Sequence, residues 1–517
     1  MTEFSARPEL TRRQLLRGAG GIAGLAAVAG GLAGVLDAAT DPRRIPSFPN
    51  RPTGEVRAFL SRPDLAPPTV TVSQPVSLPA VGGPAGGDYP GFVFLGPGPV
   101  SLKGTRQYGP LIVDSDGEPV WFHPVAPGLK VTNFSASQYR GEPVLIWWEG
   151  KVQWTGYGEG EAVIIDSTYR EVARVRAANG RTMDLHGLYL TPEGTALFTC
   201  YPQIVEADLS AFGGPRRGQL LESIVQEVDI ASGRLLFEWR SLQHVPIERS
   251  YFMLQKNRPF DYLHVNSVTP TPDGNLLVSG RHAWALYKIE RRTGRVMWTL
   301  GGKRSDFRMG QGTQFTWQHD ARHVSDHVFT VFDNGSDGYT NTEHQSRGLV
   351  LDVDESRRTV ALKRAYTGPK ELATSMGSVQ VLPAGRVVVG WGTASQTTAF
   401  ESDGGPLFDL ALPKGMFSYR GLWLPWKSIP QHPPAFAAGR DEHSGAKLVY
   451  ASWNGATEVA GWQVDGGVTA DVLRTVGVAR RRGFETIIPL HPSLTVASIT
   501  PVDHTGTALS ASRAVRL

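Results

Sequence analysis

Five polar residues lie in or near predicted strands whose other side chains are mostly apolar: His186, His264, Asn266, Arg281 and His319. A polar group in such a segment either forms its hydrogen bonds inside the core, at a cost in stability, or belongs to a functional site. Imidazole, amide and guanidinium groups that converge from separate strands would form a pocket for an oxyanion. An imidazole left free in that pocket is a good nucleophile near neutral pH. The first candidate for this nucleophile is His319.

The positions of these residues along the chain suggest how they meet. Strand alternation predicts that His264 and Asn266, two residues apart, share one face. Arg281 follows the predicted strand 276–280, so a hairpin would return it to His264. His319 comes one strand unit later, and His186 precedes the strand of an earlier repeat. The sequence therefore predicts one shared pocket.

A single histidine in a strand is more often a hydrogen-bonded structural residue than a catalytic one. The selected set is distinguished by its recurrence at similar places in successive repeats. The remaining histidines are interpreted as structural, including His282, which alternation directs to the opposite face from Arg281. Cys200, the only cysteine, follows an apolar run and is expected to be a buried, unreactive thiol. One cysteine also excludes an internal disulfide and a cysteine-based zinc cluster.

Two recurring patterns predict the elements that position the site. A tight turn followed by an apolar strand occurs at 191–197, 271–277 and 382–388. A strand, a glycine turn and a strand containing tryptophan occur at 113–121, 228–239 and 289–298. Such repeated hairpins are typical of a β-propeller, in which each blade buries its faces against its neighbours. About 330 residues at about 40 to 50 per blade give six or seven blades, and we favour six.

The expected organisation is therefore all-β: a six-bladed β-propeller followed by a small immunoglobulin-like β-sandwich. The propeller is assigned to residues 96–428, after a Pro/Gly-rich arm with short strands at 40–95. Residues 429–517, beyond a proline-dense linker, are the size of a small sandwich. A pair of β-sandwiches is the alternative architecture for the repeat region.

The amino terminus, residues 1–39, has the pattern of an export signal. Arg12 and Arg13 are followed by two leucines and by a weakly apolar Gly/Ala-rich stretch. This order is typical of a twin-arginine signal, which would make the twin-arginine translocase a partner. The segment would be cleaved near Ala38 and Ala39 or stay as a membrane anchor. We expect an exported protein that acts outside the cytoplasmic membrane.

The charge pattern gives little support to nucleic-acid binding. The net charge is only +4, and the 52 basic residues are scattered along the chain. A nucleic-acid partner requires a concentrated basic face. We therefore expect small-molecule partners.

A family resemblance adds to this interpretation. The segments 261–267, 279–281, 298–302, 305–307, 318–322 and 332–335 carry H-x-N-S, L-G-G and Q-H-D motifs in that order. Together they resemble the bacterial arylsulfotransferase family, specifically its actinobacterial-type branch, over about residues 100–425. The resemblance implies a six-bladed propeller that moves a sulfuryl group from a phenolic sulfate ester to a phenol without PAPS. No cofactor and no metal ion are expected.

The resemblance also implies a role for each candidate residue. His319 would carry the sulfuryl group as sulfohistidine, and His186 would act as acid and base toward the phenolic oxygen. His264, Asn266 and Arg281 would bind the sulfate oxygens, on which negative charge develops.

Three other functions remain open from the residues alone. The first is a non-enzymatic surface-binding propeller, and the second is a quinone-dependent dehydrogenase with similar Trp-rich repeats. The third is a metal-dependent hydrolase with His186, His264 and His319 around a divalent ion, and Asp184 or Asp320 nearby.

Overall fold

The computed structural model describes residues 56–73, 81–82, 88–89, 91–99, 107–153, 156–370 and 372–517. All of them belong to one unit, Ser47–Leu517. The expected export signal at 1–39 and part of the 40–95 arm lie outside the described residues. Within the described part, strands and short 3-10 turns make up the regular structure, and no helix is long and apolar enough to cross a membrane.

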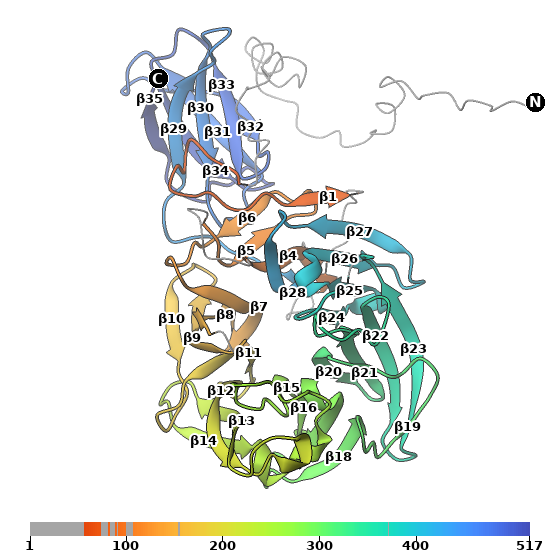
Figure 1. Ribbon diagram of the computed structural model, residues 1–517. Coiled ribbons are helices and arrows are strands. Elements are labelled where there is room, and N and C mark those ends of the chain that lie inside the picture. Colours follow the sequence, from red (N-terminus) through yellow and green to blue (C-terminus); the bar gives the residue numbers. More distant parts are fainter. Residues whose placement is uncertain are drawn as a thin grey trace, which may run out of the picture. The chain divides into compact units, whose positions relative to one another are not determined.

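The repeat region consists of antiparallel sheets that follow one another around a common centre (Figure 1). The first sheet has the order β28 (Met416–Pro425), β4 (Gly91–Pro99), β5 (Leu111–Val113) and β6 (Pro119–Phe122). An eight-stranded sheet follows, which contains β7 (Lys130–Tyr139), β8 (Glu142–Val152), β9 (Gly158–Asp166), β10 (Glu171–Val175), β11 (Met183–Leu190), β12 (Thr195–Ala207), β13 (Gly218–Asp229) and β14 (Leu235–Arg240).

Three further sheets complete the series. One contains β15 (Val265–Pro270), β16 (Leu276–Gly280), β17 (Ala285–Ile289) and β18 (Val296–Gly301). The next contains β20 (His319–Ser325), β21 (Val328–Asp333), β22 (Arg347–Asp354), β23 (Thr359–Thr367) and the short parallel strand β19 (Arg308–Met309). The last contains β24 (Ser378–Val381), β25 (Val387–Gly390), β26 (Gln396–Phe400), β27 (Pro406–Ala411) and β1 (Thr71–Ser73). A separate hairpin pairs β2 (Val81–Gly82) with β3 (Asp88–Tyr89).

The strands nearest the centre form a closed circuit. These inner strands are β7, β11, β15, β20, β24 and β28, and each contacts the next, with β28 returning to β7. β28 also pairs with β4, which joins the end of the repeat region to its beginning. The last strand of the repeat region thus belongs to its first sheet, and the circuit of sheets is closed.

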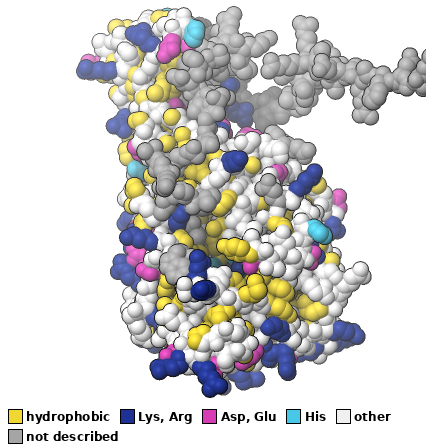
Figure 2. All heavy atoms as spheres, viewed as in Figure 1, with side chains coloured by type: hydrophobic (Ala, Val, Ile, Leu, Met, Phe, Trp, Pro, Cys, Tyr) yellow, Lys and Arg dark blue, Asp and Glu magenta, His cyan; other side chains and the backbone are white. Residues whose placement is uncertain are grey.

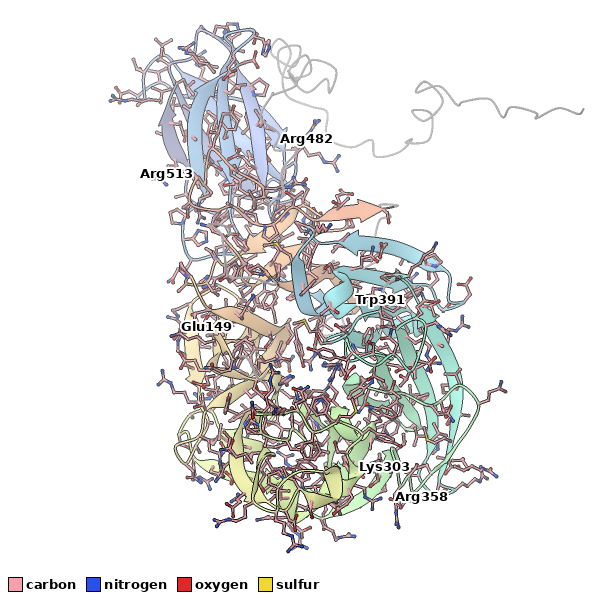
Figure 3. All side chains as sticks on the ribbon, in the orientation of Figure 1. Glu149, Lys303, Arg358, Trp391, Arg482 and Arg513 are labelled. Carbon is pink, nitrogen blue, oxygen red and sulfur yellow. The ribbon has the colours of Figure 1, made fainter. Side chains whose placement is uncertain are left out.

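Separate apolar clusters fill the spaces between consecutive sheets. One joins Leu277 and Leu286 to Phe329 and Leu349, and another joins Phe332 to Val389. In the second cluster Trp391, labelled in Figure 3, packs its indole against the Phe332 ring with centroids 5.8 Å apart. Burial of each such side chain contributes about 1.5–3 kcal/mol. The sheets therefore stabilise one another and hold the inner strands in place.

Both sequence patterns lie where the structure has hairpins. The turns before β12, β16 and β25 are those of the first pattern. The second pattern corresponds to the hairpins β5–β6, β13–β14 and β17–β18. One boundary differs from the expectation, because β4 begins at Gly91 and not after residue 95. β1, also from the expected arm, extends the β24–β27 sheet by pairing with β27.

The chain beyond β28 forms two more antiparallel sheets. One contains β29 (Ala435–Arg440), β30 (Lys447–Ser452) and β33 (Glu485–Leu490), and the other contains β32 (Arg474–Arg480), β31 (Gly461–Gly467), β34 (Val496–Val502) and β35 (Arg513–Arg516). They share an apolar core that includes Trp462 and Ile499. Asn454 connects this region to β6, because its amide accepts from Phe122 N–H at 2.9 Å and donates to Phe122 O at 3.0 Å.

Basic side chains are spread over the face seen in Figure 2 and do not form one patch there. The described residues include six 3-10 turns: η1 (Ser210–Phe212), η2 (Ser241–Gln243), η3 (Ile247–Arg249), η4 (Arg281–Ala283), η5 (Pro383–Gly385) and η6 (Gly392–Ala394). Of these, η4 begins with a candidate site residue, Arg281.

Candidate active site

A cavity of about 540 Å³ lies at the beginning of the inner strands. Four of the five sequence-predicted residues line it: His186 in β11, His264 just before β15, Arg281 at the start of η4 and His319 at the start of β20. Residues far apart in the sequence thus reach one cavity because their strands begin at the same end of the circuit.

His319 presents one imidazole nitrogen to this cavity with its tautomer fixed. Its Nδ1 lies 2.7 Å from Asn334 Oδ1. The Asn334 amide nitrogen donates to the carbonyls of Ala373 at 2.6 Å and Met376 at 3.0 Å, so its oxygen must face His319. His319 Nδ1 therefore carries the hydrogen, and Nε2 keeps its lone pair.

The surroundings of His319 keep the ring neutral. Burial lowers the pKa of His319 well below its usual value, and the positive charge of Arg281 lowers it further. The Met376 N–H points at Nε2 from 3.3 Å, and Tyr419 packs edge-on with ring centroids 6.2 Å apart. Nε2 is therefore an unprotonated nitrogen with the properties of a nucleophile.

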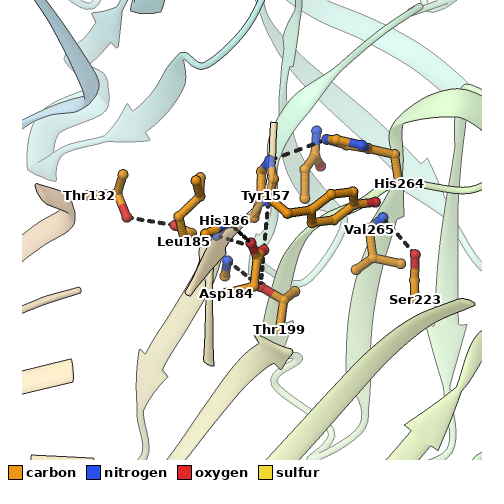
Figure 4. Close-up of polar contacts among 12 residues, drawn as sticks. Thr132, Tyr157, Asp184, Leu185, His186, Thr199, Ser223, His264 and Val265 are labelled. Atoms are coloured by element: carbon orange, nitrogen blue, oxygen red, sulfur yellow. Dashed lines mark hydrogen bonds and ion pairs between the residues drawn. The ribbon is translucent and has the colours of Figure 1, made fainter. Parts of the chain in front are cut away.

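His186 and His264 face each other, with Asp184 beside His186 (Figure 4), and each histidine is held by a carboxylate. His186 Nδ1 donates to Asp184 Oδ2 at 2.6 Å, and His264 Nδ1 donates to Asp261 Oδ2 at 2.6 Å. Their Nε2 atoms are 3.2 Å apart. Asp184 also accepts from Gly158 N–H and Thr199 Oγ1, an arrangement suited to an ionised carboxylate.

This geometry requires a proton between the two imidazoles. Each Nδ1 already carries the hydrogen that it donates to its carboxylate, so two neutral rings would point lone pairs at each other. One Nε2–H must therefore donate to the other Nε2. Burial raises the pKa of Asp261, but its interactions with His264, His282 and Tyr157 outweigh burial and bring it to about 2. Burial lowers the pKa of His264, and the charge of Asp261 acts in the opposite direction and helps to hold this proton.

Arg281 is a buried guanidinium that has no ion pair with a carboxylate among the described residues. Its Nη2 donates to Thr374 O at 2.8 Å, and its Nη1 donates to His282 Nε2 at 3.2 Å. Its Nε is buried with no hydrogen-bond partner. Burial lowers the pKa of Arg281 to about 10, which still leaves it charged at neutral pH. A buried cation with a free donor beside the cavity can bind an anion.

Asn266 differs from its expected role as a substrate-binding residue. It is completely buried outside the cavity lining, and its Nδ2 donates to Gln318 O at 2.6 Å. The alternation argument was wrong because His264 has a φ of +50° and precedes β15, whose register shifts between Val265 and Ser267. Asn266 instead fixes the backbone immediately before His319.

Several residues that contribute to the site were missed in the sequence. His282 lines the cavity and does not point away from it, since η4 interrupts strand alternation after Gly280. Its Nδ1 donates to Asp261 O at 2.5 Å, which leaves Nε2 to accept from Arg281. The D-x-H spacing of Asp184 and His186 would have indicated one carboxylate. Asn334 lies in the segment 332–335 that carries the family resemblance, but its contact with His319 across the β20–β21 hairpin was not predicted.

One group of side chains has the spacing of a metal site, but it is not the trio expected from the sequence. Asp261, His264 and His282 place ligand atoms within 4.8 Å of one another. The Nδ1 atoms of both histidines already donate to Asp261, one to its carboxylate and one to its carbonyl. A metal ion would have to replace both hydrogen bonds and a proton on each ring. The present arrangement fits metal-free chemistry better.

The cavity wall nearest the solvent is rich in aromatic and apolar side chains. Phe252, Tyr339, Phe417 and Met376 line it, and Tyr339 is 87% exposed. An aromatic ring can pack against such a wall while a charged group on it reaches the histidines. Cys200 lies elsewhere as a buried thiol, in agreement with the expectation, and burial raises its pKa.

The sequence matches a known family over most of the sheets that build this cavity. The family model described as arylsulfotransferase (ASST) matches residues 136–411. That range contains His186, His264, Arg281, His319 and Asn334. No curated protein matches the chain.

Solved structures similar to the chain have low sequence identity. A protein of unknown function from Bacteroides caccae is 14% identical, with 65% of this chain and 99% of that chain covered and a TM-score of 0.40. A streptogramin B lyase is 11% identical, with 74% and 94% covered and a TM-score of 0.33. Virginiamycin B lyase from Staphylococcus aureus is 9% identical, with 64% and 84% covered and a TM-score of 0.24.

Proposed function

Because the chain belongs to the arylsulfotransferase family, we propose that it transfers a sulfuryl group from a phenolic sulfate ester to a phenol without PAPS. The observation that carries the proposal is the pairing of an unprotonated His319 Nε2 with Arg281, a buried cation that has no ion pair with a carboxylate in the described part of the protein. The first group suits attack on sulfur, and the second suits a sulfate ester anion.

In the first step His319 Nε2 attacks the sulfur of the donor. An N–S bond forms as the bond between sulfur and the aryl oxygen breaks, and the electron pair stays on that oxygen. The Met376 N–H lies close to His319 Nε2, and the unpaired Arg281 Nε–H lies beside the cavity. Both donors can stabilise the sulfuryl oxygens. Asn334 accepts from Nδ1–H throughout and supports the positive charge that develops on the ring.

The leaving aryl oxygen takes the proton that His186 and His264 share. Loss of this proton leaves two Nε2 lone pairs facing each other at 3.2 Å, and this close contact favours the return of a proton. In the second step it takes the proton of the acceptor phenol, whose oxygen attacks sulfur as the N–S bond breaks. Such acid–base assistance is worth about 10²- to 10⁴-fold in each direction.

The family resemblance alone implied that His186 transfers the proton and that His264 binds sulfate. In the proposed mechanism the two rings share the proton. The 3.2 Å contact makes both rings parts of one acid. The apolar rim formed by Phe252, Tyr339 and Phe417 supports a preference for aryl over alkyl sulfates. The steps use only side chains of this protein and need neither a cofactor nor a metal ion.

The family resemblance also suggests the fold of the enzyme and its location in the cell. We propose that the closed circuit of sheets is a six-bladed propeller, and that the two sheets beyond β28 form an immunoglobulin-like sandwich. The twin-arginine pattern at Arg12 and Arg13 supports export by the twin-arginine translocase. The enzyme would then act outside the cytoplasmic membrane, either released or held by its amino-terminal segment.

Incubation with 4-nitrophenyl sulfate tests the proposal, with and without a phenol acceptor and with and without a chelator. We expect nitrophenol release that depends on the acceptor and is unaffected by the chelator. Arg281→Lys should lower kcat/KM by about 10²-fold, because one point charge replaces a fork of donors. Release without an acceptor would indicate a sulfatase, and loss with the chelator would indicate a metal-dependent hydrolase. No release from any aryl sulfate would favour a binding protein.

A further inference from the structure

A second cavity, of about 350 Å³, lies among the same inner strands but farther along them. The active-site cavity contacts these strands near their beginnings, at His186 of β11 and His319 of β20. The second cavity contacts them at Leu188–Leu190 and Arg322–Val324. The two cavities have no lining residue in common. The circuit of strands therefore encloses two separate chambers.

Buried polar residues lie between the two chambers. Asp320 follows His319 directly and is 1% exposed. Asn133 is also buried and donates to Leu185 O at 2.7 Å, while Asn266 donates to Gln318 O. A ligand in the second chamber would therefore be separated from the reacting nitrogen of His319 by ordered protein.

The second chamber contains more positive than negative charge. Arg322 and Arg420 line it, and no carboxylate is among its lining residues. Both guanidiniums share Asp320 beneath: Arg322 Nη2 lies 3.0 Å and Arg420 Nε 2.9 Å from Asp320 Oδ1. One carboxylate balances one of these two charges. The second positive charge has no counter-ion within ion-pair distance in the described part of the protein.

Each guanidinium also has a nitrogen free to bind. Arg322 donates from Nε and Nη2 to Asp320. Arg420 donates from Nη1 to Asn133 Oδ1 at 2.5 Å, and its Nε lies within ion-pair distance of Asp320 without a hydrogen bond. Arg322 Nη1 and Arg420 Nη2 have no polar partner among the described residues. Ser135, Ser137 and Thr269 are among the same lining residues, and the Thr269 hydroxyl also lies 3.5 Å from Ala321 O, to which it donates. Guanidinium and hydroxyl donors together match a tetrahedral oxyanion.

We propose that this second chamber is a binding site for a small tetrahedral oxyanion, sulfate or phosphate, held between Arg322 and Arg420. Such an anion would supply the missing negative charge where an unpaired guanidinium is costly. The site lies outside the proposed sulfuryl-transfer site and does not depend on that reaction.

Anion titrations of two double variants test the site. Arg281→Gln removes the guanidinium of the active-site cavity, so that binding measured in its background reports the second chamber. Arg322→Gln is added because the Arg322 side chain is 31% exposed and its loss leaves the Asp320–Arg420 pair intact. Arg357→Gln is the matched control, since that side chain is 83% exposed and pairs with Asp354 elsewhere.

Isothermal titration with sodium sulfate and with sodium phosphate, at ionic strength matched by sodium chloride, gives the affinities. We expect Arg281→Gln and Arg281→Gln/Arg357→Gln to bind at least one oxyanion equally well, and Arg281→Gln/Arg322→Gln to bind it about tenfold or more weakly. The tighter of the two anions identifies the ligand. Unchanged affinity with Arg322→Gln, or no binding of either anion in the Arg281→Gln background, would overturn the proposal.

A crystal of the wild-type protein grown with selenate provides a second readout that does not depend on a variant. The anomalous signal of selenium should appear between Arg322 and Arg420. A signal found beside Arg281 and absent from the second chamber would contradict the proposal.

Discussion

The hydrogen bond between Asn334 and His319 determines which imidazole nitrogen can react. Without Asn334 Oδ1, only the long contact of the Met376 N–H with Nε2 would favour the hydrogen on Nδ1, and a fraction of the rings would carry it on Nε2. In the proposed reaction Asn334 therefore positions His319 and does not itself touch the substrate.

Asn334→Leu should lower kcat by about 10- to 100-fold, since a buried hydrogen bond worth about 1–3 kcal/mol is removed. KM should change little, because the Arg281 contacts remain. Steady-state kinetics with 4-nitrophenyl sulfate measures both constants. A rise in KM with an unchanged kcat would mean that Asn334 acts on substrate binding and not on the tautomer of His319.

Among individual residues, the sequence indicated four that line the cavity but not the partners that hold them. His186, His264, Arg281 and His319 were identifiable because a polar side chain in an apolar strand is conspicuous. Asn266 was assigned to the substrate because residues two apart in a strand share a face, and the positive φ of His264 breaks that rule. The role of Asn334 depends on a contact across a hairpin, which spacing does not reveal.

The segment that ends at Gly377, just before β24, brings the Met376 N–H to His319. Gly377 has a φ of +112°, and a Cβ at this position would lie 2.3 Å from the Phe332 ring. Its N–H donates to Tyr419 O at 3.0 Å, which links the segment to β28. The glycine is thus required both by its backbone conformation and by close packing.

Gly377→Ala should lower the free energy of unfolding by about 1–3 kcal/mol and reduce transfer activity, as the segment shifts away from His319. Gly405→Ala is the control, because its Cβ would meet only the Asp403 side chain, at 3.2 Å. Urea unfolding and the transfer assay check the two effects. Equal stability and activity in the two variants would contradict this role for Gly377.

The hairpins were predictable from sequence because turn residues and apolar alternation are local signals. The closure by β4 and β28 was not, since these paired strands lie more than three hundred residues apart in sequence. For the same reason the expected arm included the beginning of β4. The eight-stranded sheet also required the structure, because it depends on a pairing between Met183 and Gly160.

Across the whole molecule, buried neutral histidines make stability depend on pH. Burial lowers the pKa of both His282 and His319 well below the value of about 6.5 expected in the unfolded chain. The unfolded chain therefore takes up protons first as the pH falls. The stability these residues contribute is complete above about pH 6.5 and is lost below it.

We expect the free energy of unfolding to fall by about 1 kcal/mol per such histidine between about pH 7 and about pH 5.5. Urea unfolding across this range measures the decrease, and His319→Asn should make it smaller. An identical slope in wild type and His319→Asn would mean that His319 is protonated in the folded protein.

The proposed export depends on two residues near the amino terminus, Arg12 and Arg13. Replacement of Arg12 and Arg13 by lysine should keep the protein in the cytoplasm, because the twin-arginine route recognises the arginine pair. Cell fractionation with an antibody against the protein checks the location. Unchanged secretion of the double variant would rule out this route.

The central claim is that His319 Nε2 forms the covalent bond to sulfur. Intact-protein and peptide mass spectrometry of a quenched reaction with 4-nitrophenyl sulfate and no acceptor tests it most directly. The account predicts one added sulfuryl group, located on His319, that disappears when phenol is added and never forms in His319→Asn. A sulfuryl group on another residue, or full transfer activity in His319→Asn, would contradict it.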